Sequence, residues 1–136
     1  MLTHYDTASE NVAELSRRVM DLLLVEEHWT KYRLAITGWG DVTTPTDPDA
    51  VHLCLYAAVI RAENGKEFSK AANTYRYTLC SLIPPDPEED PEESGNTFVQ
   101  ISTFNDSWKT TFSTLRALLT QADKLIKAAP GALSPL

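Results

Sequence analysis

The clearest pattern of apolar and polar positions lies in the last quarter of the chain, where apolar residues recur every three or four positions and polar residues fill the gaps. This spacing is typical of an amphipathic helix with one apolar face. We therefore predict a helix over residues 111–129, with Thr111 as its N-cap, and a frayed tail over residues 131–136. The apolar stripe consists of Leu115, Leu118, Leu119, Ala122, Leu125, Ile126 and Ala129.

Two further helices are indicated by start signals followed by apolar residues at helical spacing. Thr7 and Glu10 have the spacing of a capping box, which predicts a first helix over residues 8–27. Ser69 is the predicted N-cap of a helix over residues 69–83, which the Pro-Pro pair after it stops. The second half of that segment, YRYTLCSLI, also alternates in polarity, so a strand is the alternative there.

A central helix is predicted over residues 48–63. Asp47 and Pro48 have the residue types of an N-cap and a first-turn proline, and Asn64-Gly65 is typical of a left-handed helix stop. The segment VHLCLYAAVI is apolar nearly all round, which indicates a buried helix.

Two short strands complete the predicted elements. Residues 32–36 read as a short strand before a Gly- and Pro-rich loop, and residues 97–103 are rich in β-branched and aromatic side chains. The predicted fold is therefore mainly α, with about four helices packed around the central apolar one. The predicted helices cover residues 8–27, 48–63, 69–83 and 111–129.

The negative charge of the chain is concentrated in one segment. The net charge is −7, and six of the acidic groups lie within residues 86–93, so the other residues carry 12 basic and 13 acidic groups. We predict a single domain over residues 1–136 with an exposed acidic, Pro-rich loop over residues 84–96. Because the body of the chain has no basic excess, we expect no direct binding of nucleic acid.

Hydropathy and cysteine content indicate the environment of the protein. The longest apolar run, residues 53–60, is far shorter than the ~20 residues of a membrane span, and the N-terminal residues lack the features of a secretory signal. Cys54 and Cys80 lie in apolar surroundings, so we expect two reduced thiols, with a disulfide as the alternative. These features predict a soluble cytoplasmic protein with no membrane partner.

Three blocks of the chain follow one another in a recognisable order. The first is a Gly-Trp pair, and the second is the Cys-containing, Ala-rich segment HLCLYAAVIRA. The third is an aromatic-Asn-Asp turn, a threonine five residues after the Asp, and the segment LRALLTQA. The residues that carry the blocks are Gly38, Trp39, Cys54, Phe104, Asn105, Asp106 and Thr111.

In these blocks the chain resembles an uncharacterised "domain of unknown function" family of small proteins, found mainly in actinobacteria and their phages. The match covers most of the chain after Gly38. The family usually has a glutamate three residues after the threonine, where this chain has Thr114, so the capping box of the last helix is incomplete. The acidic loop is not a feature of the family. The resemblance supports the predicted fold and implies no activity.

The Asn105-Asp106 pair is the main candidate for a site. We interpret it first as a turn, because Asx side chains bond backbone N–H groups two residues on. The alternative is a binding site that also includes Trp39 and Trp108, since a helix N-terminus nearby would offer free N–H donors. Trp29 and Trp39 are expected to pack at the edge of the core, whereas exposed aromatic residues would mark a binding face.

No recognisable catalytic chemistry is present in the sequence. The chain has no GxSxG, HExxH, CxxC or phosphate-binding glycine motif. His52 and Cys54 lie two positions apart on a predicted helix, so they would point to different faces and could not hold one metal ion. We therefore expect no catalytic residue, no metal ligand and no cofactor.

The expected function is that of a small soluble non-enzymatic protein, a protein–protein interaction module. We hypothesise that it is encoded by a phage and contacts a host protein through an exposed face or the acidic loop. The alternative is a small-molecule binding or sequestering protein with a pocket near the Asn105-Asp106 turn. An enzyme with an unrecognised site is a third hypothesis, and the oligomeric state is not predicted.

Overall fold

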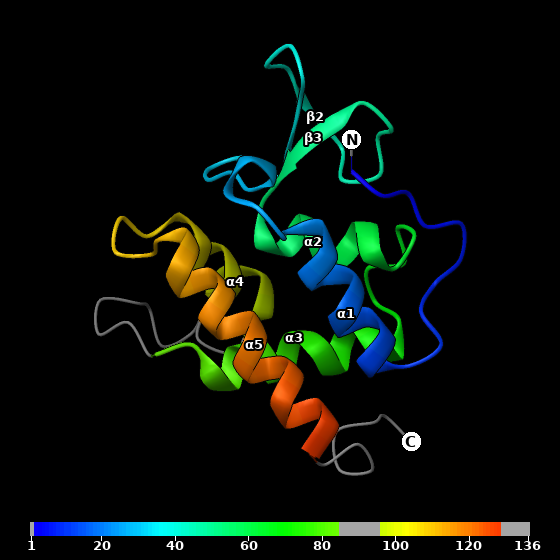
Figure 1. Ribbon diagram of the computed structural model, residues 1–136, viewed down its shortest axis with the longest axis vertical. Coiled ribbons are helices and arrows are strands. Elements are labelled where there is room, and N and C mark those ends of the chain that lie inside the picture. The colour runs from blue at the N-terminus through cyan, green and yellow to red at the C-terminus, as the bar shows by residue number, and fades with distance from the viewer. Residues whose placement is uncertain (1, 85–95, 129–136) are drawn as a thin grey trace.

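The computed structural model describes residues 2–84 and 96–128. Figure 1 shows a small sheet at one end of the molecule and the helices at the other. In the described part of the chain the helices are α1 (Val12–Leu22), α2 (Leu55–Ala62), α3 (Lys70–Leu82), α4 (Thr97–Asp106) and α5 (Phe112–Ala128), with a 3-10 turn η1 (Glu26–His28). The strands are β1 (Ala35–Thr37), β2 (Val42–Thr43) and β3 (Ala50–Leu53). The predicted fold class, mainly α with a few short strands, is confirmed.

The sheet is antiparallel with the strand order β2-β1-β3. Ala35 in β1 pairs with Thr43 on one side and with Leu53 on the other. The outer edge of β3 is covered by the segment after η1, because Trp29 forms a bridge with Leu53 and the Thr30 N–H donates to the Leu53 carbonyl at 3.0 Å. This contact fixes the start of the segment that leads into β1.

α2 lies at the centre of the helical part, and seven of its eight residues are buried. It packs against α1 and α4, while α3 packs against α1, α4 and α5. Figure 1 shows α5 running diagonally across the front of α3, with α1 beside α5. The prediction of a central buried helix is therefore confirmed for residues 55–62.

The predicted starts of α3 and α5 are confirmed by their capping bonds. The Ser69 hydroxyl accepts a hydrogen bond from the Ala72 N–H at 3.0 Å, and the Thr111 hydroxyl accepts one from the Thr114 N–H at 3.1 Å. The alternative strand over the second half of α3 is wrong. Within the predicted stripe of α5, Leu125 is 41% exposed, so the buried face is narrower than the sequence pattern indicates.

The prediction for the first helix is wrong at both ends. Asn11, rather than Thr7, is the N-cap, and its side-chain oxygen accepts from the Glu14 N–H at 2.9 Å. The helix ends at Leu22, and the chain then forms η1. Carbonyl groups of the residues before Asn11 accept hydrogen bonds from Arg18 of α1 and Arg61 of α2.

The predicted helix over residues 48–63 begins too early. Residues 50–53 form the edge strand β3, and α2 begins only after Cys54, whose Sγ accepts from the Ala57 N–H at 3.3 Å. Asp47 makes a turn, because its carboxylate accepts from the Asp49 N–H at 2.8 Å. The Asn64-Gly65 stop is confirmed, since both residues have positive φ, 54° and 84°.

The predicted strand over residues 97–103 is a helix. Asn96 caps α4 by accepting from the Phe98 and Val99 N–H groups at 3.0 and 3.3 Å. Ile101 is fully buried, and α4 packs against α2 and α3, so burial outweighs the β-propensity of this segment. The other strand, predicted over residues 32–36, occupies 35–37 because the positive φ of Tyr32 interrupts the extended chain.

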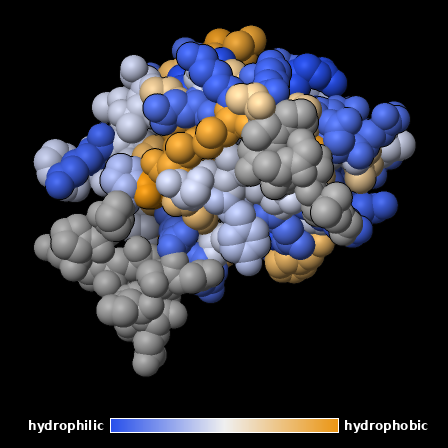
Figure 2. Space-filling model, turned by 90° about the horizontal axis from the view of Figure 1, so that it is seen from below, coloured by the Kyte–Doolittle hydropathy of each residue, from blue (hydrophilic) through white to orange (hydrophobic). Residues whose placement is uncertain are grey.

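The end of the molecule away from the sheet carries an apolar band between hydrophilic side chains (Figure 2). Leu82 and Ile83 at the end of α3 are partly buried against the core. The predicted acidic loop, except for its two end residues, and the predicted frayed tail lie outside the described residues. Among the helices that the structure describes, none is both long and apolar enough to cross a membrane.

Candidate functional site

Asn105 joins three parts of the chain that are distant in sequence. Its Oδ1 accepts from the indole N–H of Trp29 at 2.7 Å and from the backbone N–H of Leu55 at 3.0 Å. Its Nδ2 donates to the Thr30 carbonyl at 3.0 Å and to Asp106 Oδ1 at 2.9 Å. The side chain therefore ties α4 to the segment after η1 and to the first turn of α2.

The hydrogen-bonding capacity of Asn105 is fully used within the chain. A side-chain amide has two donors and an oxygen with two lone pairs, and all four are occupied here. Asn105 is only 1% exposed. Leu55 is the first residue of α2, so Asn105 serves one of the N–H groups that a helix start leaves free, while Cys54 serves another.

Asp106 binds the backbone of the segment that leads into β1. Its Oδ1 accepts from the backbone N–H of Tyr32 at 2.8 Å. Tyr32 has φ of 68°, in the left-handed region that a bulky side chain rarely occupies, and its ring is 64% exposed. The carboxylate thus holds a backbone conformation that turns an aromatic ring toward solvent.

Lys31 reinforces the same junction. Its ammonium group donates to the carbonyl oxygens of Ser107 and Thr110 at 2.7 and 2.8 Å, and it lies 5.3 Å from the centre of the Trp29 ring. Ser107 follows directly after α4, so Lys31 serves carbonyl groups of the connection to α5. The segment around residue 32 and the connection from α4 to α5 are consequently held side by side.

These contacts overturn the interpretation of Asn105-Asp106 as a local turn. The two residues end α4, and their side chains bond to segments 50 or more positions away or to each other. The local bonds expected of a strand-to-helix turn depended on a strand over residues 97–103, which is absent. A binding role for the pair stays a prediction.

The two candidate tryptophans lie in different places. Trp108 is in the connection from α4 to α5, two residues after Asp106, and is 82% exposed with the Lys109 ammonium 5.6 Å from its ring centre. Trp39 is in the turn between β1 and β2 and is 68% exposed, so the expectation that it packs at the edge of the core is wrong. Trp29 does pack against the core.

The junction between residue 32 and the α4–α5 connection carries exposed rings and cations. We call this the aromatic–basic surface, and it consists of Tyr32, Arg33, Trp108 and Lys109, all exposed. Arg33 donates to the Tyr32 carbonyl at 3.0 Å, which keeps its guanidinium beside the tyrosine backbone. Asp106 and Trp108 therefore belong to one region, and the structure adds Tyr32, Arg33 and Lys109 to it.

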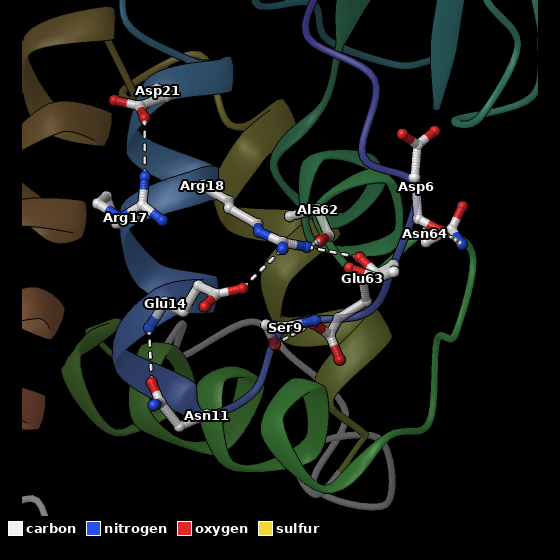
Figure 3. Close-up of polar contacts among 11 residues, drawn as sticks. Asp6, Ser9, Asn11, Glu14, Arg17, Arg18, Asp21, Ala62, Glu63 and Asn64 are labelled. Carbon is white, nitrogen blue, oxygen red and sulfur yellow. Dashed lines mark hydrogen bonds and ion pairs between the residues drawn. The ribbon is translucent and has the colours of Figure 1, made fainter.

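A second polar cluster surrounds the end of α2 (Figure 3). Arg18 donates to the carbonyl oxygens of Thr7 and Ala62, each at 2.8 Å, and forms an ion pair with Glu14 at 2.6 Å. Glu63 is fully buried and accepts from the Ser9 N–H at 2.7 Å. The cluster fastens the N-terminal segment to α2, and the buried Glu63 carboxylate is closed to a substrate.

The remaining candidates have no geometry for chemistry in the described part of the chain. No group of three or more His, Cys, Asp or Glu side chains could hold a metal ion there. Cys54 is a buried thiol, and burial raises its pKa to about 11, which keeps it protonated and unreactive at neutral pH. An open hollow of about 260 Å³ lies between α1 and α5, and none of the residues that line it belongs to the aromatic–basic surface.

Sequence reasoning missed Tyr32 and Arg33 because they lay within a predicted strand. A signal was present, since the stretch HWTKYR alternates aromatic rings with basic groups and SWK repeats the pattern after Asp106. The positive φ of Tyr32 has no such signal, because non-glycine residues in that region depend on tertiary contacts.

A model of a protein family described as a family of unknown function, DUF6197, matches residues 7–125. The chain therefore belongs to the DUF6197 family, and the resemblance inferred from the sequence is confirmed. The matched range includes every residue of the aromatic–basic surface. Neither the curated proteins nor the solved structures yielded a match.

Proposed function

We propose that this member of the DUF6197 family is a non-enzymatic module that binds a host protein through the aromatic–basic surface. The observation that carries the proposal is the state of Tyr32. Its backbone is held in an unfavourable conformation by Asp106, and the result is an exposed ring rather than a buried one. Strained residues persist where surrounding contacts enforce them, and they cluster at binding sites.

The composition of the surface supports protein binding. Tryptophan, tyrosine and arginine are the residues most enriched among those that dominate the binding energy of protein interfaces. Tyr32 and Trp108 are 64% and 82% exposed, and they lie on segments fixed by Lys31 and Asp106. Rings on a fixed backbone lose little conformational freedom when a partner binds, which favours affinity.

The alternative function, binding of a small molecule near Asn105, has less support. Every donor and acceptor of the Asn105 side chain is engaged within the chain, so none is left for a ligand. The hollow between α1 and α5 is lined by other residues. A phage origin and a cytoplasmic location remain parts of the proposal, and the buried thiol of Cys54 supports the cytoplasmic location.

Capture from a lysate of the native host tests this function. Tagged full-length protein is compared with Tyr32→Ala and Trp108→Ala, and bound proteins are quantified by mass spectrometry. We expect a partner whose capture falls at least roughly tenfold in both variants, as for residues that dominate an interface. Tyr77→Ala and Trp39→Ala are matched controls, because these rings are 66% and 68% exposed elsewhere on the molecule.

The proposal is wrong if no captured protein depends on Tyr32 and Trp108, or if the control variants reduce capture as much. Melting temperatures of all four variants establish that each is folded before capture is compared. The two controls are essential because removal of any exposed ring lowers nonspecific adsorption.

A further inference from the structure

We propose that the partner presents an acidic peptide segment to the aromatic–basic surface, an inference that rests on the proposed function. The surface differs in charge from the rest of the molecule. Residues 29–34 and 105–110, which carry it, contain three basic groups and one acidic group, whereas the rest of the chain outside residues 86–93 has 9 basic and 12 acidic groups. A partner guided by charge would therefore approach this surface with negative groups.

The cations of this surface differ in their availability. Lys31 is committed to two backbone carbonyl groups and to the Trp29 ring, so it stabilises the fold. Arg33 and Lys109 are exposed, and their contacts lie within their own segments. The Asp106 carboxylate is engaged by the Tyr32 N–H and the Asn105 amide. Two free cations are thus presented beside two exposed rings.

This arrangement fits carboxylates next to apolar or aromatic side chains. Arg33 lies beside the Tyr32 backbone, and Lys109 lies over the Trp108 ring, so each cation accompanies a ring. A peptide side chain packed on a ring would bring a neighbouring carboxylate to the adjacent cation. Pairing of a carboxylate with a guanidinium is strongest where the contact excludes water, and packing on the rings provides such exclusion.

Single-stranded nucleic acid is the other class of polyanion that binds rings and cations. It is less favoured because such proteins follow the phosphate backbone with a groove of many basic groups. Here two exposed cations lie on a molecule of net charge −7, which would repel a long polyanion. The experiment includes it as an outcome that would overturn the inference.

Selection from a random library of displayed 12-residue peptides tests the inference on the full-length protein. We expect the selected peptides to be enriched in Asp and Glu beside aromatic or aliphatic residues, and to need Trp108. Their dissociation constants are then measured against the charge-reversal variant Arg33→Glu/Lys109→Glu. The matched control is Lys66→Glu/Lys124→Glu, which changes the net charge by the same amount at exposed positions elsewhere.

We expect the first double variant to weaken binding by roughly tenfold or more, the control to weaken it less than about threefold, and binding to weaken as salt is raised. Selected peptides that need Trp108 but lack acidic residues would overturn the acidic partner and leave the proposed function standing. Failure to select any peptide that needs Tyr32 or Trp108 would count against the proposed function as well. Binding of an oligothymidylate that Trp108→Ala abolishes would overturn the acidic peptide in favour of nucleic acid.

Discussion

Replacing Asn105 by alanine removes four hydrogen bonds at the junction of α4, α2 and the segment after η1. The side chain is almost fully buried, and the Leu55 N–H that it serves belongs to a residue of zero exposure. Water cannot replace the lost partner of that N–H without opening the start of α2. Trp29 is only partly buried, so water reaches its indole N–H at lower cost.

The magnitude follows from the groups left without partners. A buried polar group that loses its only partner costs about 1–3 kcal/mol. The Leu55 N–H is left in that state, and the Thr30 carbonyl and the Trp29 N–H, which belong to partly buried residues, are partly so. We therefore expect Asn105→Ala to lower the free energy of unfolding by about 3–5 kcal/mol, several times the effect of losing a surface turn residue.

Urea unfolding followed by far-ultraviolet circular dichroism measures this loss. Asn96→Ala is the matched control, because Asn96 has the same side chain at the other end of α4 and caps it in solvent. That substitution should cost about 1 kcal/mol. If Asn105→Ala costs no more than Asn96→Ala, the junction does not hold the fold together and our account of the site is refuted.

Three further predictions concern the core, the thiol and the acidic segment. Leu119→Ala should lower the free energy of unfolding by about 2–5 kcal/mol and Leu125→Ala by less than about 1, since their exposed fractions are 0% and 41%; equal losses in urea unfolding would contradict this. Burial raises the pKa of Cys54 from 9.0 to about 11, so its contribution to stability is complete below about pH 9 and declines as the pH rises toward 11. Unfolding measured across that range should show a shallower decline for Cys54→Ala than for the wild type. Replacing residues 86–93 by a Gly/Ser linker should move the melting temperature by only a few degrees, because loop-closure entropy changes slowly with length; a large drop would show that the segment packs on the body.

The parts of the fold that sequence predicts well are those in which local signals and burial agree. α3 and α5 have a capping hydroxyl, a helical apolar stripe and a stop, and each was located within one or two residues at the ends that the structure describes. In such segments the local sequence supplies both the groups that cap the helix and the apolar side chains that pack in the core. In these helices the tertiary contacts favour the same structure as the local pattern.

The failures occur where tertiary contacts outweigh local preference. The segment TFVQISTF has the residue types of a strand, yet it forms α4 because Asn96 caps it and Ile101 enters the core against α2 and α3. Asp47 and Pro48 read as a helix start, yet the next residues pair with β1. Such pairing with a distant partner leaves no mark in a single sequence.

The sequence predicts only part of the candidate site, because its other residues are brought there by contacts between distant parts of the chain. The sequence pattern indicates Asn105 and Asp106 because a polar pair stands between a predicted strand and a helix N-terminus, and Trp108 lies close by in sequence. Tyr32 could not be joined to them, because the bond from its N–H to Asp106 spans 74 positions. The tryptophan in the β1–β2 turn was grouped with them only because of its residue type.

The packing of α1 against α5 sets the order in which a newly made chain can fold. Arg116 of α5 donates to the carbonyl oxygens of Met20 and Leu23 at the end of α1, at 2.9 and 3.2 Å, and Ser16 of α1 donates to Asp123 of α5 at 2.9 Å. At about 5–20 residues per second, roughly 5–20 s pass on the ribosome between completion of α1 and of α5. During that interval α1 and α3 lack the contacts that α5 makes with both of them. We therefore expect the nascent chain to depend on ribosome-associated chaperones until its last helix emerges from the exit tunnel.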